Sequence, residues 1–270
     1  MRNRILLFLS MFFLVTNADA QTADSATSLQ KAPKPTYRKN LVKMNVTALL
    51  LNNYSFSYER LLTRKISFTA GYRIMPKTTI GEISLLNKVY EKIDEDYVDG
   101  SKEFVGVDLN QLEVKSSAIT AEFRFYTGKK PGARGFYFSL YGKYADFKSN
   151  YNLDFESSNG NVMIPMSADN KAFAGGFSFG VQWQIAKRVA IDLTILGAHY
   201  GTLKGDIVST KDLSGLSPAD KQDLQDQLDE MLDFGDRTYI TSSVSNQGIT
   251  GTMKGPFAGL KTGISIGIAF

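Results

Sequence analysis

The chain has 270 residues, a formal net charge of +4 and no cysteine. Its 43% apolar content excludes wholesale disorder, and its length suits one large or two ordinary domains. Without cysteine there are no disulfides, thiolate metal sites or cysteine nucleophiles, and a single histidine excludes a His-rich metal site. We therefore predict no cofactor and no bound metal. A charge of +4 is also too small to indicate a nucleic-acid partner.

The first twenty residues are typical of an export signal. Arg2 and Arg4 precede an apolar run over 5–15, and Ala18-Asp19-Ala20 fits the small-residue rule for signal peptidase. The alternative is a membrane anchor helix, but the run is too short for a bilayer core, which needs about 20 apolar residues. We predict a cleaved signal peptide over 1–20. Residues 21–39, rich in Ala, Ser, Thr, Lys and Pro, are predicted to form a flexible periplasmic linker.

From residue 40 onward, apolar and polar side chains alternate repeatedly, which is typical of β-strands with one apolar face. One parity is bulky and often aromatic, and the other is dominated by Gly, Ser, Thr and Ala with isolated charges. The pattern predicts eight strands, over 41–51, 54–59, 67–74, 119–125, 136–144, 177–183, 189–195 and 260–270.

The apolar face could meet a protein core or lipid. A soluble β-sandwich or lipocalin-like barrel also alternates, but its outward set is charged. Here the bulky set carries no charge within the strands except Arg60, at a strand end. We predict an all-β fold, an eight-stranded antiparallel transmembrane β-barrel over 40–270, with outer-membrane lipid against its apolar face.

The connections between the predicted strands differ in length. Those at 63–65, 128–134 and 186–188 are short, whereas those at 77–115, 147–172 and 201–255 are long. Short periplasmic turns and long extracellular loops are the outer-membrane pattern. Aromatic residues near the strand ends suggest two interfacial girdles: Phe125, Phe136, Trp183 and Phe270 below, and Tyr54, Tyr72, Tyr144, Phe173 and Tyr200 above.

Two of the long loops contain candidate helices. One covers 81–94, and the other covers 217–235, where Ser217 can cap, Pro218 suits the first turn, and Leu224, Leu228 and Leu232 repeat at i+4. Loops 77–115 and 201–255 each hold nine acids and five bases. The apolar stripes of the two candidate helices could pack on each other, on the barrel rim or on an unknown protein partner. The sequence does not decide between these three possibilities.

Eight charged residues occupy the inward-facing positions of the predicted strands, and we predict that they form a barrel-interior polar network: Lys43, Glu59, Arg73, Glu122, Arg124, Lys143, Asp192 and Lys261. Buried charges require partners, so each acid is expected within salt-bridge reach of a base. The alternative is a gated ion path or proton relay. Five bases face three acids, and the two excess bases are expected near the rims.

The last eight residues resemble a known sequence signal. Residues 263–270 end in an aromatic residue, with apolar residues at every second position before it: Ile264, Ile266, Ile268 and Phe270. This resembles the signal read by the barrel-assembly machinery of Gram-negative outer membranes. With its signal peptide and strands, the chain resembles small OmpA-like barrels. The Tyr58-Glu59-Arg60 stretch resembles an uncharacterised Bacteroidetes-type barrel family. The resemblance implies a location in the cell outer membrane and supplies no activity that could be transferred to this chain. Two-domain members of the family carry a peptidoglycan-binding domain after the barrel, which we do not expect here.

Three functions remain for such a chain. The first is a non-enzymatic barrel that displays its loops for surface interaction or envelope integrity, and we favour it. The second is a narrow gated pore, against which eight strands argue. The third is an outer-leaflet lipid-modifying enzyme, as some eight-stranded barrels are. His199 is its only histidine base, predicted to face outward, and the position two residues later is Gly201, not the serine of the deacylase pattern. We therefore predict no enzymatic activity.

Overall fold

The computed structural model describes residues 37–84, 103–104, 107–108, 110–185, 188–231 and 239–270. The predicted signal peptide and nearly all of the predicted linker lie outside these residues. The main sheet contains β1 (Asn40–Asn45), β2 (Tyr54–Leu61), β3 (Ile66–Thr79), β6 (Glu113–Tyr126), β7 (Gly135–Ser157), β8 (Gly160–Gln184), β9 (Val189–Ser209), β10 (Ile240–Ser245) and β11 (Gly248–Ala269). Two short strands, β4 (Glu103–Phe104) and β5 (Val107–Asp108), pair with each other.

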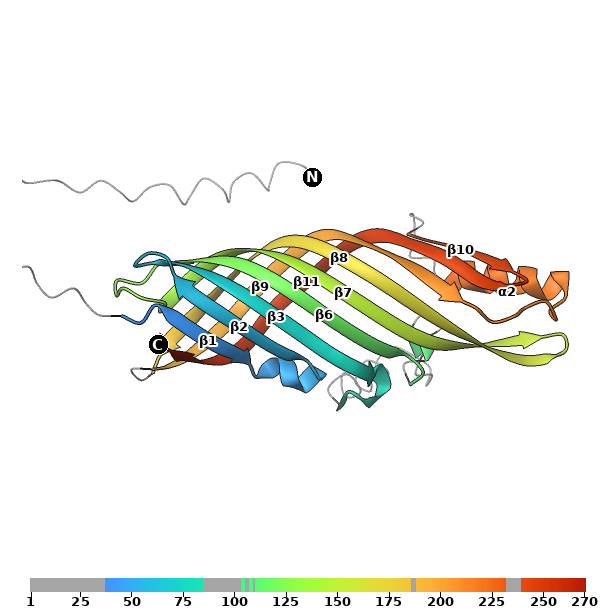
Figure 1. Cartoon of the computed structure of the whole chain (residues 1–270), viewed down its shortest axis with the longest axis horizontal. Helices are drawn as coiled ribbons and strands as arrows, with labels where there is room; N and C mark the ends of the chain where they lie inside the picture. Colours follow the sequence, from blue (N-terminus) through green and yellow to red (C-terminus); the bar gives the residue numbers. More distant parts are fainter. Residues whose placement is uncertain (1–36, 85–102, 105–106, 109, 186–187, 232–238) are drawn as a thin grey trace, which may run out of the picture. The chain divides into compact units, whose positions relative to one another are not determined.

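The main sheet is antiparallel and closes on itself (Figure 1). Its strand order is β1-β2-β3-β6-β7-β8-β9-β11-β10, and a further pairing joins β1 to β11. One edge of β11 pairs with β9 along almost its whole length. Its other edge pairs with β10 over 248–253 and with β1 over 265–269. The predicted antiparallel all-β class is confirmed, and the backbone hydrogen bonds form a ring.

Side chains alternate between the inside and the outside of this ring, as strand geometry requires. The inward side chains are mostly small or polar and are buried. The outward ones are large and apolar and stay exposed, for example Phe56 on β2, Phe123 on β6, Phe177 on β8 and Ile266 on β11. Soluble monomers rarely expose so large a continuous apolar surface.

Most strands are longer than the alternation predicted, and β7, β8, β9 and β11 exceed their predicted bounds by the most. The expected loop over 147–172 is wrong, because β7 and β8 continue to a two-residue turn at 158–159. Gly160 adopts a φ of +115° there, which favours glycine, and the Ser157 Oγ donates to its carbonyl oxygen at 2.6 Å. The expected loop over 201–255 is also partly wrong, since it contains the end of β9, all of β10 and the start of β11.

The first strand is shorter than predicted. β1 ends at Asn45, and Thr47–Leu51 form a 3₁₀ helix, η1, in place of the second half of the predicted strand 41–51. The Asn45 side chain stops the strand because its Oδ1 accepts hydrogen bonds from the Thr47 hydroxyl at 2.8 Å and the Ala48 amide at 3.1 Å. Alternating apolar residues alone did not distinguish this short helix from a strand.

A β-bulge in β9 changes which residues face inward. The register between β8 and β9 shifts after Phe179, which pairs with Leu196, whereas Gly180 pairs with Thr194. Ile195 and Leu196 are consequently both exposed, and the parity of later residues is reversed. The predicted outward position of His199 is therefore wrong: its side chain is buried, and its Nδ1 lies 3.1 Å from the Tyr141 hydroxyl.

The predicted helix over 217–235 corresponds to α2 (Pro218–Met231), and residues 232–238 lie outside the described part. The Ser217 hydroxyl accepts the Asp220 amide at 3.1 Å, and the Asp220 carboxylate accepts the Ser217 amide at 3.1 Å, which closes a capping box. Leu224 and Leu228 are fully buried beside the extended strands, against residues that include Ile164, Ile207, Leu213, Ile240 and Ile249. The apolar stripe of α2 is thus covered by this chain.

The other predicted helix, over 81–94, falls mostly outside the described residues. Its start is the 3₁₀ helix η2 (Ile80–Glu82). Within the described part of the chain, no helix is both long enough and apolar enough to cross a bilayer.

Candidate functional site

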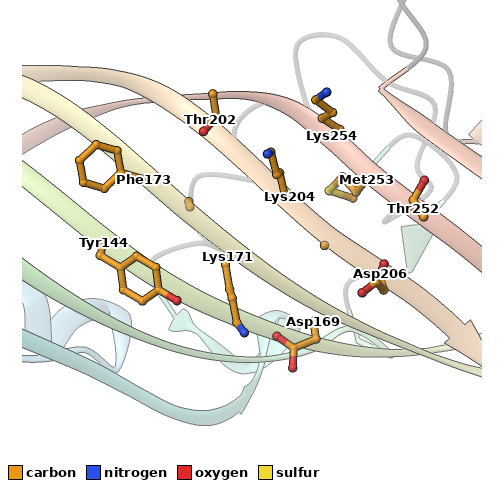
Figure 2. A pocket seen from close by; sticks show the side chains of 12 residues that line it. Tyr144, Asp169, Lys171, Phe173, Thr202, Lys204, Asp206, Thr252, Met253 and Lys254 are labelled. Carbon is orange, nitrogen blue, oxygen red and sulfur yellow. The ribbon is translucent and has the colours of Figure 1, made fainter.

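A hollow lies on the outward face of β7, β8, β9 and β11 (Figure 2). It lies toward the end of the ring that carries the β7–β8 turn, which we call the upper end. Tyr144 and Phe173 lie along one side of it and are exposed. Charged side chains lie further along the same strands: Asp169, Lys171, Lys204, Asp206 and Lys254. The hollow is wide and open, and it combines aromatic and charged residues in separate rows.

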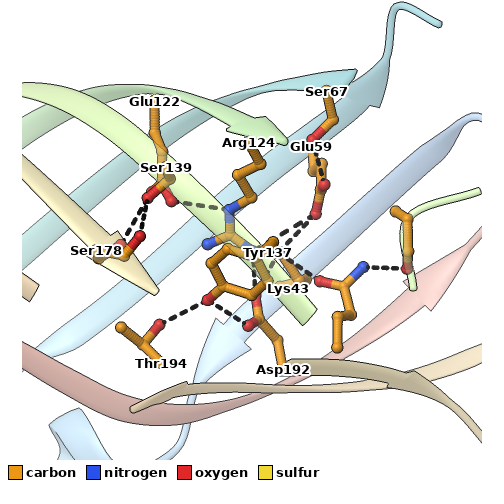
Figure 3. A network of polar contacts seen from close by, with 12 residues as sticks. Lys43, Glu59, Ser67, Glu122, Arg124, Tyr137, Ser139, Ser178, Asp192 and Thr194 are labelled. Atoms are coloured by element: carbon orange, nitrogen blue, oxygen red, sulfur yellow. Dashed lines mark hydrogen bonds and ion pairs between the residues drawn. The ribbon is translucent and has the colours of Figure 1, made fainter. Parts of the chain in front are cut away.

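Inside the ring, a buried ionic network connects several strands (Figure 3). The Lys43 ammonium of β1 lies 2.7 Å from the Glu59 carboxylate of β2 and 2.6 Å from the Asp192 carboxylate of β9. It also donates to the Gln182 side chain of β8 at 3.0 Å. Lys43 is only 2% exposed, so these contacts replace its entire hydration shell.

Arg124 of β6 forms the second half of the network. Its Nη1 contacts the Asp192 carboxylate, and its Nε lies 2.9 Å from the carboxylate of Glu122. Glu122 also pairs with Lys261 of β11, at 2.7 Å. The guanidinium lies 4.4 Å from the ring centre of Tyr137, whose hydroxyl donates to Asp192 at 2.9 Å. Three bases and three acids are thereby joined in one cluster, which links strands from opposite sides of the ring.

An apolar and aromatic layer closes the ring below the network. It consists of Leu41, Leu61, Tyr126, Ala133, Tyr137, Ala190 and Ala269, with Tyr37 packed against it. The Tyr126 hydroxyl donates to Glu59 at 2.6 Å, and Gln182 donates to the Ala133 carbonyl at 2.7 Å, so the layer and the network are bonded together.

Six of the eight residues predicted for the interior network lie in this cluster. Glu59, Glu122 and Asp192 each contact a base within 3 Å, as the parity argument expected. Arg73 and Lys143 are not in the cluster. Both line a cavity next to the cluster, together with Lys261, and Arg73 also lines a smaller cavity that reaches Glu122 and Asp192. Among the described residues, neither has a carboxylate within salt-bridge distance.

The sequence reasoning missed the uncharged members of the network. Gln182, Tyr126 and Tyr137 each donate a hydrogen bond to a group in or beside it. Their inward parity was the available signal, because a polar residue among the inward positions of a filled barrel has to find a partner. His199 and Tyr141 were missed for another reason, the bulge in β9.

Ile264, Ile266 and Ile268, which belong to the predicted assembly signal, are exposed on β11. Phe270 directly follows the strand and is also exposed. The chain has no cluster of three or more metal-ligating side chains among its described residues.

No protein-family model and no curated protein matches this sequence. Two chains from solved structures match, one of them in the crystal structure of Acinetobacter baumannii CarO2. The chain is 10% identical to CarO2, with 86% of this chain and 98% of CarO2 covered and a TM-score of 0.35. This likeness is too low to assign a role, so the function has to be inferred from the geometry of the chain itself.

Proposed function

We propose that this chain is a non-enzymatic outer-membrane protein, in which an eight-stranded transmembrane β-barrel displays extracellular segments for surface interaction or envelope integrity. The ring formed by β1, β2, β3, β6, β7, β8, β9 and β11 is the barrel of this proposal.

One observation carries the proposal: large apolar side chains are exposed on every strand of the ring, while five charged side chains are buried inside it, namely Lys43, Glu59, Glu122, Arg124 and Asp192. Burying one such side chain is worth about 1.5–3 kcal/mol, so water would disfavour this arrangement strongly. Lipid would not, because hydrocarbon tails solvate these side chains. The inward–outward distribution is that of a protein whose outer solvent is a bilayer.

Two rows of side chains mark the proposed upper boundary of the bilayer. Exposed Tyr144 and Phe173 are paired neighbours on β7 and β8 (Figure 2). Two residues further along the strands, Lys171, Lys204 and Lys254 are neighbours on β8, β9 and β11. Aromatic side chains favour the interface, and lysines just beyond it suit anionic lipid headgroups.

The ionic network argues for a closed interior and against the pore alternative. An eight-stranded barrel has room for side chains but not for a solute path, and at the level of the network buried side chains occupy that room. The segment beyond the bilayer would be the β7–β8 hairpin together with α2. A protein partner would contact its polar surface, since Leu224 and Leu228 are already buried.

The test expresses the chain in a Gram-negative bacterium and separates the two membranes. We expect the protein in the outer membrane, extractable only with detergent. Protease added to intact cells should cut within 77–115 or 201–255 and not at 63–65 or 128–134. A freely soluble periplasmic protein would contradict the proposal, and a stable single-channel conductance in planar bilayers would favour the pore.

A further inference from the structure

The wall of the ring is interrupted on one side. β1 ends at Asn45, and the last backbone–backbone hydrogen bond between this segment and β11 runs from the Val46 amide to the Ile264 carbonyl, at 2.9 Å. β10 joins the same edge of β11 only at residue 253. Between them, over 255–263, no strand among the described residues pairs with this edge. The helix η1 lies where the continuation of β1 would complete the wall.

A cavity of about 620 Å³ leads inward from this interruption. Its outer lining is aliphatic: Leu50 and Leu51 of η1 on one side, and Leu260 and Ile264 of β11 on the other. Leu260 is 75% exposed, the largest value among the exposed large hydrophobic residues of the described chain. The volume falls within the range of about 300–1,000 Å³ that is common for small-molecule sites.

The inner lining of the cavity is cationic. Arg73, Lys143 and Lys261 line it, and no Asp or Glu does. Lys261 is paired with Glu122, but Arg73 and Lys143 have no carboxylate partner among the described residues. The Arg73 Nε is buried and has no hydrogen-bond partner. The two bases that are not paired in the network therefore both line this cavity, and Arg73 also borders a smaller cavity that Glu122 and Asp192 line. A partly buried charge without a partner is unfavourable unless an anion joins it.

Both ends of the ring are closed above and below this cavity. The ionic network lies below it. Above it, Ala118, Ala145 and Ala172 pack with Phe147, Leu203 and Phe257. Lys143 lies under this layer, with its ammonium 5.4 Å from the ring centre of Phe257. The interruption beside η1 is consequently the open side, and it faces the same direction as the outward apolar side chains.

We propose that this cavity binds a fatty-acid-like amphiphile that enters sideways from the membrane. Its carboxylate lies against Arg73 and Lys143, and its alkyl tail leaves between η1 and β11. This inference rests on the proposed membrane location, because only a surrounding bilayer would supply such a ligand along the leucine-lined mouth. Tyr141 and His199, which also line the cavity, offer further hydrogen-bonding groups.

The test reconstitutes the full chain into phosphatidylcholine vesicles and adds palmitate that carries a photoreactive group in its tail. Illumination followed by peptide mass spectrometry locates the cross-links. We expect them on residues 47–51 and 260–264. The methyl ester of the same probe should label these residues at least tenfold less, because it carries no charge for the two bases.

A matched pair of variants tests the role of the charges. Arg73→Gln with Lys143→Gln should reduce labelling by palmitate at least tenfold. Lys171→Gln with Lys204→Gln removes the same charge from the outward face and should leave labelling unchanged. Heat-dependent gel mobility shows whether each variant folds, and the comparison of acid with ester in the unsubstituted protein needs no variant.

Other results would overturn the inference. Equal labelling by acid and ester would mean that the cations do not select the ligand. Displacement of palmitate by equimolar acetate would indicate a site for free anions without a tail. Labelling spread evenly along the outer strands would indicate contact with bulk lipid only. Normal insertion without specific labelling would refute the amphiphile site alone, whereas failure to insert would refute the membrane proposal as well.

Discussion

Replacing Asp192 with asparagine should be among the most destabilising single substitutions in this chain. Asp192 contacts two bases, Lys43 and Arg124, and accepts a hydrogen bond from Tyr137. Asparagine has the same size, so no cavity forms, but the network then holds three bases and only two acids. Removing one partner of a buried ion pair costs about 3–5 kcal/mol, because it leaves an uncompensated charge in a medium of low polarity.

A surface pair provides the matched control. Lys148 and Asp169 are separated by 2.6 Å, the same distance as Lys43 and Asp192, but their side chains are about half exposed. Asp169→Asn should therefore cost only about 0–1 kcal/mol. The assay is urea unfolding in lipid vesicles, followed by the fluorescence of Trp183, the only tryptophan, which is outward and half-exposed.

The result that would refute this reasoning is an equal loss of unfolding free energy in the two variants. Because Asp192→Asn could prevent folding altogether, the double variant with Lys43→Met serves as a second measurement. It restores the balance to two bases and two acids, so it should be more stable than Asp192→Asn alone. A double variant that is less stable would show that charge balance does not govern the network.

Three further outcomes are expected. Hydrogen bonds from Ser158 and Ser217 lower the pKa of Asp220 from 3.8 to about 2, so its stabilisation of the α2 cap is complete above about pH 4 and is lost as the pH falls toward 2; amide exchange in α2 should accelerate over that window and not between pH 5 and 7. Phe177→Arg places a charge on the outward face of β8 and should cost about 2–4 kcal/mol in vesicle-unfolding experiments if this position lies near mid-bilayer. Leu224→Ala should cost about 2–5 kcal/mol locally, seen as faster proteolysis of residues 210–250 with an unchanged barrel core.

The features that follow from side-chain alternation were predictable from the sequence. Strands with a small or polar inner face and a bulky outer face need only period-two patterning, and each of the eight predicted segments contains part of an observed strand. The contacts of Glu59, Glu122 and Asp192 followed from one physical rule, that charges removed from water need opposite charges nearby. Which base contacts which acid was not predictable, because it depends on strand stagger around the ring.

The features that depend on local backbone geometry were harder to predict. Beyond residue 146 the alternation in β7 continues with its apolar residues on the opposite parity, because Tyr151, Leu153 and Phe155 alternate with polar residues and point inward. Asn159-Gly160 is a recognised hairpin signal that could have indicated the turn. The end of β1 depends on one side chain, that of Asn45, which competes with the strand by accepting the Ala48 amide. The hydrophobic pattern does not indicate this end of the strand, because Ala48 and Leu50 continue the apolar alternation.

The bulge in β9 shows how one local irregularity shapes the cavity. On β11, the Thr262 hydroxyl lies opposite the bulge and contacts the carbonyls of Thr194 and Ile195, at 3.1 and 3.2 Å. The reversed parity that follows turns His199 inward, toward Tyr141 and the excess bases.

Close by, Gly263 has a φ of +150°, and a Cβ on it would lie 2.8 Å from the side chains of Asn45 and Thr47. The irregular points of β1, β9 and β11 therefore converge at the interrupted side of the ring. Each of these three departures from regular strand geometry removes hydrogen bonds between neighbouring strands, whereas the rest of the wall is fully paired. Their occurrence at one place is more simply explained by a shaped opening than by three independent irregularities. A regular strand through residues 46–51 would close the wall and enclose Arg73 and Lys143 without an anion. Enclosing a charge without a partner is strongly unfavourable in free energy.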